Sequence, residues 1–348
     1  MRADVSAKFH VASGRAVASR TAGSLIASAL LWACGGPADD TAASSATAGD
    51  DGTPGEESLP QAGRPAQVPS QFVATPHGYF HPSCVVELGD DERVGNSGEV
   101  VRSSGEQRAI TRCRHSRYDK RGRLVVKKDA AATTPPPAVN GWVASISSTS
   151  VGPVKTISAT WDVPRAPKVA GNQTLYFFPG LEPSATGDAI LQPVLAWNGF
   201  NDGRWTIASW NCCKDANALH SKPKVVSAGD TITGTVVGSS CNAQGVCASW
   251  RVRATSSRGV STTLNTTSHG QVLDWEFAGA FEAYSVDSCD QYPSDGRVAF
   301  TSIAVRLTSG AVTTPAWVAM NYGTSPGCLT SVASDPGGRN ASLAWVTQ

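Results

Sequence analysis

Ile157-Ser158-Ala159-Thr160-Trp161-Asp162-Val163 alternates apolar and polar side chains without a break. Side chains along a β-strand point to opposite faces in turn, so this period of two predicts a strand with one buried face. Other stretches rich in strand-forming residues follow at 248–254, 297–307 and 316–320, with Gly, Pro, Asn and Ser turns between them. The sequence therefore predicts one all-β domain over residues 140–348, a sandwich or barrel large enough to bury a substantial core.

The charge of this domain limits the partners that it can attract. Residues 141–348 carry thirteen basic and thirteen acidic side chains, and a neutral surface does not concentrate polyanions, so no nucleic-acid partner is expected. A Walker loop, a GxGxxG motif and an HExxH motif are all absent from the chain. The two histidines of the domain, His220 and His269, fall in polar, turn-like contexts and are expected in surface loops.

The N-terminal region has the composition of an export signal followed by a tether. Arg15 and Arg20 precede an apolar stretch at 22–33 that is too short to span a bilayer. Leu31-Trp32-Ala33-Cys34 resembles a bacterial lipobox, which implies removal of residues 1–33 and a lipid on Cys34. The protein is then expected in the bacterial cell envelope, anchored to the outer membrane, or secreted if no lipid is added. Residues 35–75 have few large apolar side chains and predict a disordered tether.

Residues 76–129 are predicted as a small basic segment of their own. Three interpretations compete for it: a disulfide-clipped pro-segment or spacer, which is favoured, a zinc site, and a patch that binds polyanions. The zinc interpretation would use His77, His81, Cys84, Cys113 and His115, whose spacing matches no compact zinc finger. Residues 130–139 follow as a proline-rich linker.

Eight cysteines remain in the exported chain once Cys34 is set aside. Disulfides are the expectation in an oxidising compartment. The plausible local bridges are Cys84 with Cys113 and Cys241 with Cys247. Adjacent Cys212 and Cys213 are expected to have different partners, with Cys289 and Cys328 as the candidates.

Two polar side chains stand out in strand-like apolar runs. Only three glutamates follow Asn140, namely Glu182, Glu276 and Glu282, and Glu282 lies inside the apolar run 277–284. Gln192 lies inside a second apolar run, 189–197. Burying either group is costly unless it finds a partner or a task. The alternative is that both are ordinary strand residues, Gln192 bonded to a loop and Glu282 facing solvent.

Four segments, in order, resemble the glutamic peptidases called eqolisins. These are Asn140-Gly141-Trp142-Val143-Ala144, Thr160-Trp161-Asp162-Val163-Pro164, Ala189-Ile190-Leu191-Gln192, and Ala280-Phe281-Glu282-Ala283-Tyr284 with the strand 296–301 after it. The resemblance covers most of 140–307 and implies a concanavalin-like antiparallel β-sandwich. It also implies that Glu282 activates a water as general base while the Gln192 amide stabilises the oxyanion, without metal or cofactor. A polypeptide is then the expected substrate.

The chain also departs from the family pattern. The family segment Gly-Ile-Asp-Gly is here Gly180-Leu181-Glu182-Pro183, so Glu182 is a possible alternative carboxylate, as in the neprosin-like peptidases that use two glutamates. Glu276 has the same strand parity as Glu282, which puts both on one face if the strand runs unbroken. Core packing is the commoner role of large aromatics, but a substrate groove could be lined by tryptophans, with Trp142, Trp161, Trp197, Trp210 and Trp275 as candidates.

A rival hypothesis comes from a different functional class. The same sandwich could be a non-catalytic carbohydrate-binding or adhesion module that binds glycan through exposed tryptophan and asparagine side chains. The two hypotheses differ in whether Gln192 and Glu282 converge on one groove. Side chains more than about 10 Å apart, or on opposite faces, would rule out the hydrolase mechanism for this pair.

Overall fold

The computed structural model describes residues 64–119, 121–125, 142–185, 189–322 and 327–347, all within one unit of the chain, Glu57–Gln348. The predicted signal peptide, Cys34, most of the tether and the 130–139 linker lie outside the described residues. Within the described part, no helix is long and apolar enough to cross a bilayer.

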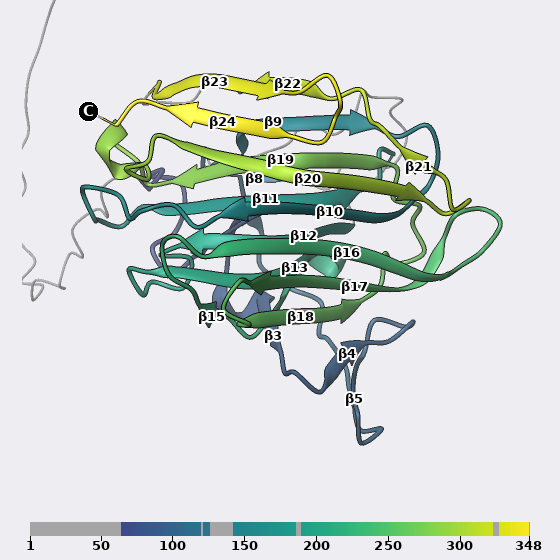
Figure 1. Ribbon diagram of the computed structural model, residues 1–348. Coiled ribbons are helices and arrows are strands. Elements are labelled where there is room, and N and C mark those ends of the chain that lie inside the picture. Colours follow the sequence, from purple (N-terminus) through teal and green to yellow (C-terminus); the bar gives the residue numbers. More distant parts are fainter. Residues whose placement is uncertain (1–63, 120, 126–141, 186–188, 323–326, 348) are drawn as a thin grey trace, which may run out of the picture. The chain divides into compact units, whose positions relative to one another are not determined.

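Two large sheets lie face to face (Figure 1). The nine-stranded sheet has the strand order β22-β9-β19-β11-β12-β13-β14-β3, with β15 added beside β13. Its strands are β22 (Val318–Asn321), β9 (Trp142–Thr149), β19 (Trp275–Tyr284), β11 (Thr174–Glu182), β12 (Ala189–Trp197), β13 (Trp205–Cys213), β14 (Ala218–Ser221), β3 (Val85–Leu88) and β15 (Lys224–Val225).

The eleven-stranded sheet has the order β23-β24-β20-β10-β16-β17-β18-β4-β5-β6, with β21 beside β20. Its strands are β23 (Leu329–Ser334), β24 (Ala341–Trp345), β20 (Arg297–Leu307), β10 (Val154–Asp162), β16 (Thr231–Cys241), β17 (Cys247–Ser256), β18 (Ser261–Thr266), β4 (Glu92–Val94), β5 (Val100–Arg102), β6 (Gln107–Arg108) and β21 (Val312–Thr313). Nearly all neighbours in both sheets are antiparallel; β14 with β3 and β18 with β4 are parallel.

A third, small sheet comes entirely from the N-terminal part of the described chain. Its order is β1-β2-β7-β8, with β1 (Val73–Thr75), β2 (Gly78–Phe80), β7 (Arg117–Tyr118) and β8 (Leu124–Val125). Three short 3-10 helices complete the described structure, η1 (Pro82–Cys84), η2 (Lys214–Ala216) and η3 (Cys289–Gln291). The prediction of an all-β, antiparallel β-sandwich is confirmed.

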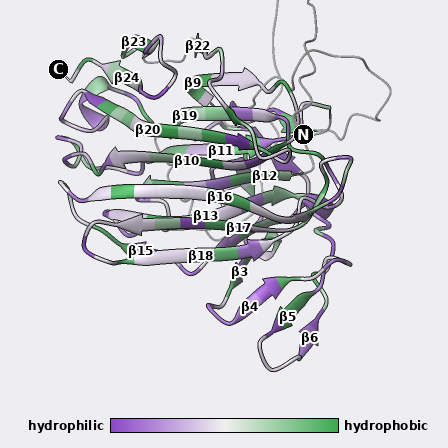
Figure 2. Ribbon diagram, turned by 45° about the vertical axis from the view of Figure 1, so that its right-hand side comes forward, coloured by the Kyte–Doolittle hydropathy of each residue, from purple (hydrophilic) through white to green (hydrophobic). Residues whose placement is uncertain are grey.

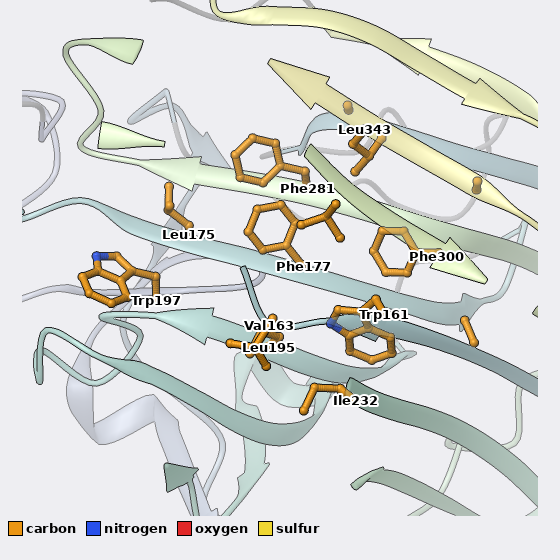
Figure 3. Packing of buried hydrophobic residues seen from close by; sticks show 14 of the residues in the cluster. Trp161, Val163, Leu175, Phe177, Leu195, Trp197, Ile232, Phe281, Phe300 and Leu343 are labelled. Carbon is orange, nitrogen blue, oxygen red and sulfur yellow. The ribbon is translucent and has the colours of Figure 1, made fainter. Parts of the chain in front are cut away.

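The alternation that predicts the fold is also what builds its core. Along β10, Ile157, Ala159 and Trp161 are buried while Asp162 is exposed. Trp161 packs against Phe300 of β20, with the ring centroids 5.5 Å apart, and Phe177 stacks on Phe281 at 4.5 Å (Figure 3). Each large side chain buried in this way contributes roughly 1.5–3 kcal/mol. Figure 2 shows hydrophobic and hydrophilic residues interspersed along the strands of the large sheets.

The N-terminal part is integrated with the sandwich more closely than its composition predicts. Residues 64–75, assigned above to the tether, include buried Val68 and Phe72, because even a few apolar side chains can be ordered by an apolar surface beside them. The segment predicted as separate contributes β3 to one large sheet and β4–β6 to the other. We call residues 64–125 the covering segment.

The disulfides confirm the two local predictions and correct the third. Cys84 is bonded to Cys113, and Cys241 to Cys247. Cys212 and Cys213 are bonded to each other, and Cys289 is bonded to Cys328. The expectation that Cys212 and Cys213 have separate partners was therefore wrong, because the two candidate partners, Cys289 and Cys328, are bonded to each other.

Candidate active site

The outer face of the nine-stranded sheet, which is turned away from the eleven-stranded sheet, carries the candidate site. Side chains from β9, β11, β12, β13 and β19 on this face form one buried cluster with residues of the covering segment, including Phe72, Tyr79 and Phe80. The opposite side chains of the same strands pack between the two large sheets. The covering segment therefore lies over the outer face and removes it from solvent.

Gln192 lies on this face in β12. It is fully buried, and neither atom of its side-chain amide has a hydrogen-bond partner within the part of the chain that the structure describes. Its cross-strand neighbour in β13 is Trp210, whose indole N–H is also buried without a partner. An orphaned buried amide costs roughly 1–3 kcal/mol, so the site holds a donor and an acceptor that the fold itself does not use.

Glu182 is the nearest carboxylate to Gln192 that the strand register provides. Leu181 pairs with Leu191, which sets Glu182 beside Ile190, one diagonal step from Gln192 on the same face. Diagonal neighbours lie about 7–8 Å apart at their Cα atoms, within reach of two long side chains. Burial raises the pKa of Glu182 to about 8, and the Arg117 guanidinium of the covering segment acts in the opposite direction.

Glu282 is on the same face but at a distance from Gln192. It pairs with Tyr176 of β11, whereas Gln192 lies beside Gly180, so the two differ by four residues along β11 and by two strands across the sheet. That offset separates their Cα atoms by about 16 Å. Glu282 is fully buried, and its Oε2 accepts a hydrogen bond of 3.1 Å from the Tyr284 hydroxyl. The structure therefore does not bring Gln192 and Glu282 together.

The pair Glu182 and Glu282 is even further apart. Glu182 is itself in β11, and Glu282 pairs with Tyr176 of that strand, so the two are offset by six positions along the strand, or about 20 Å. The order of the eqolisin-like segments along the chain predicted which strands carry these residues. The distance between the residues depends on the register in which the strands pair, and the order of segments does not define that register.

Glu276 does not share the face of Glu282, contrary to the expectation for an unbroken strand. A β-bulge between Phe277 and Gly279 reverses the parity of β19. Glu276 pairs with Leu181, which packs in the cluster between the sheets. Burial raises the pKa of Glu276 to about 8; a Ser150 hydrogen bond lowers it and Asp274 raises it by smaller amounts.

The tryptophans divide between the two sides of the sheet. Trp142, Trp210 and Trp275 belong to the cluster on the outer face. Trp161 and Trp197 lie between the sheets, so they cannot line a groove on the outer face. With the covering segment in place, no tryptophan in the described residues is among the exposed large hydrophobic side chains.

The covering segment adds two basic side chains that the sequence did not single out as parts of this site. His77 packs against Trp210 at 6.0 Å between ring centroids, and burial, followed by the Arg117 guanidinium, holds its pKa well below the ordinary value. The Arg117 Nη1 atom lies 3.0 Å from the Cys213 Sγ atom. His220 is buried in β14, 4.6 Å from the Trp210 ring, so its predicted place in a surface loop was wrong.

Cys84 and Cys113, two of the ligands that a zinc site at 77–115 would need, are joined to each other. Among the described residues, no group of three or more His, Cys, Asp or Glu side chains could hold a metal ion.

Comparison with known proteins yields only distant structural likeness. No protein-family model matches the chain, and no curated protein matches it. Among solved structures, scytalido-glutamic peptidase with a peptide-based transition-state analogue is 19% identical, with a TM-score of 0.42, covering 59% of this chain and 98% of that one. The eqolisin SCP-B in complex with the tripeptide Ala-Ile-His is 18% identical, with the same TM-score and coverage.

A tailspike protein of bacteriophage CBA120 is also similar to part of the chain. It is 15% identical at a TM-score of 0.28 and covers 51% of this chain and 28% of that one. Likeness at these levels does not decide function, which is argued below from the site.

Proposed function

We propose that this protein is an endopeptidase of the glutamic type, in which Glu182 and Gln192 act on the peptide bond without metal or cofactor. The observation that carries the proposal is the juxtaposition of Glu182 with a buried Gln192 whose amide has no partner in the described fold. An amide donor without a partner, next to a carboxylate, supplies the oxyanion hydrogen bond and the general base that peptide hydrolysis needs. The substrate is a polypeptide.

The roles of the two residues follow from their chemistry. Ionised Glu182 takes a proton from a water molecule, whose oxygen attacks the carbonyl carbon of the scissile bond. The Gln192 N–H donates a hydrogen bond to the oxygen on which negative charge develops. Glu182 then returns the proton to the leaving nitrogen, and the carbon–nitrogen bond breaks. Glu182 ends ionised and Gln192 unchanged.

We also propose that the covering segment is a pro-segment. Gln192 and Glu182 are buried beneath it. It places Arg117 near Glu182 and His77 against Trp210, the cross-strand neighbour of Gln192, so a substrate cannot reach the pair while it is in place. Removing it returns solvent to Glu182, and the pKa of that carboxyl then falls toward the ordinary value of 4.5. The same event exposes the site and ionises its base.

The test uses the full chain with a protease site inserted in the linker near Pro135. Denatured casein is the substrate, from about pH 3 to about pH 8, before and after the linker is cut. Activity that appears on cutting, and that Glu182→Gln and Gln192→Ala each reduce by roughly 10²–10³-fold, is the expected result. No activity from the cut, folded protein at any pH would reject the peptidase.

We further propose that Cys34 carries the lipid that holds the protein at the cell envelope, on the strength of the lipobox-like residues Leu31-Trp32-Ala33-Cys34. Incorporation of labelled palmitate into the full chain tests this placement. Wild-type protein should take up label and Cys34→Ser should not; equal labelling of both, or labelling of neither, would contradict the lipid anchor.

A further inference from the structure

Two backbone atoms of the covering segment form hydrogen bonds with tyrosine hydroxyls of the outer face. The Tyr176 hydroxyl donates to the Ala74 carbonyl oxygen at 3.0 Å. The Gly78 amide N–H donates to the Tyr284 hydroxyl, also at 3.0 Å. Both tyrosines are buried on the face that carries Gln192 and Glu182, and their rings lie 5.9 Å apart. Ala74 and Gly78 lie on the two arms of the β1–β2 hairpin, so the tyrosines bind one backbone atom from each arm.

Glu282 fixes the direction of the hydrogen bond at Tyr284. A hydroxyl has one proton, and the Tyr284 proton is directed to the Glu282 Oε2 atom, which leaves the Tyr284 oxygen as an acceptor for an N–H. Tyr176 uses its own proton on a carbonyl. The pair therefore offers one acceptor and one donor, which complements the N–H and C=O that a residue of an extended chain presents on one side.

We propose that Tyr176 and Tyr284 bind the main chain of an extended polypeptide substrate, that Glu282 is the positioning residue that keeps the Tyr284 hydroxyl as an acceptor, and that Ala74 and Gly78 occupy this subsite in the intact chain. The proposal rests on the proposed peptidase function and assigns Glu282 to substrate binding. Contacts to backbone atoms alone accept any side chain, so this subsite selects for extended chain and not for sequence.

The subsite also defines a length of substrate. The strand register sets Tyr176 about 14 Å and Tyr284 about 22 Å from Gln192 at their Cα atoms. An extended chain spans these distances with about four and about seven residues. A peptide that reaches that far from the scissile bond gains the two hydrogen bonds, and a shorter peptide does not. Each bond to a neutral hydroxyl is worth roughly 0.5–1.5 kcal/mol, or a factor of about 2–12 in affinity.

Two readouts test this subsite, both on the full chain cut at the inserted linker site and freed of the covering segment. The first is hydrolysis of synthetic peptides extended stepwise on either side of one scissile bond. Tyr284→Phe, Tyr176→Phe and Glu282→Gln should each raise KM for long peptides by roughly 2–12-fold, with kcat held, and the penalty should shrink as the peptide shortens. Tyr292→Phe, which removes a hydroxyl from the cluster between the sheets, is the matched control.

The second readout does not need catalysis. Fluorescein-labelled peptides of the same series are titrated onto the Glu182→Gln protein, and anisotropy gives the Kd. Tighter binding with length that Tyr284→Phe removes supports the subsite even if no peptide is cleaved, so failure of the peptidase and failure of the subsite are distinguishable. Affinity that does not depend on length, or a KM penalty equal for short and long peptides, would overturn the proposal. Loss of kcat in Glu282→Gln at every length would instead make Glu282 part of the chemistry.

Discussion

Two buried glutamates make the stability of this protein depend on pH. Glu182 and Glu276 each have a pKa of about 8 in the folded chain, against an ordinary value of 4.5, mainly because burial disfavours the charged form. Folding thus favours the protonated carboxyls. Their contribution to stability is fully present below about pH 4.5 and is lost as the pH rises through about 8.

The corresponding prediction concerns unfolding by denaturant at pH 5 and at pH 8.5. Wild-type protein should lose a few kcal/mol of unfolding free energy between the two, and Glu182→Gln and Glu276→Gln should each flatten the dependence. Glu106→Gln is the control, because the Glu106 side chain is largely exposed in its ion pair with Arg102. A slope that neither buried substitution changes would contradict the assigned burial of these carboxyls.

At the scale of elements, the covering segment is held to the outer face by apolar side chains, with Phe80 of β2 almost fully buried there. Phe80→Ala should weaken the docking of the segment by roughly 3–5 kcal/mol and give the uncut chain peptidase activity. The matched variant Phe177→Ala, in the cluster between the sheets, should destabilise the fold without this gain. Activity assays beside thermal unfolding of both variants distinguish loosening of the cover from general loss of structure.

The period of two in the sequence predicted where strands form. The register in which those strands pair determines which side chains meet at the candidate site. The alternation at 157–163 correctly indicated a strand with one buried face, and the two polar residues in apolar runs correctly marked strands of one sheet. The partner of Gln192 could not be predicted, because one bulge at 277–279 and the register of β11 decide which carboxylate comes near. Gly279 permits that bulge, since a side chain there would collide with the Phe300 ring of the opposite sheet. The sequence could have predicted that Tyr284 lies beside Glu282, because residues two apart on a strand point to the same face.

At the scale of the whole molecule, no disulfide in the described residues joins the covering segment to the rest of the fold. Cys84 and Cys113 both lie within the segment, and the other three bridges lie within the sandwich. One cut in the linker should therefore let the segment leave without a reductant. Size-exclusion chromatography of the cut protein, with and without dithiothreitol, checks this; release only under reducing conditions would contradict the described pairing.

The central claim is that Glu182, and not Glu282, supplies the base that works with Gln192. The most direct measurement is kcat and KM on a long peptide for the cut protein beside its Glu182→Gln and Glu282→Gln variants, each confirmed as folded. The account predicts a loss of kcat of roughly 10²–10⁴-fold in Glu182→Gln, and a raised KM with kcat held in Glu282→Gln. The reverse pattern, with kcat lost in Glu282→Gln and kept in Glu182→Gln, would contradict it.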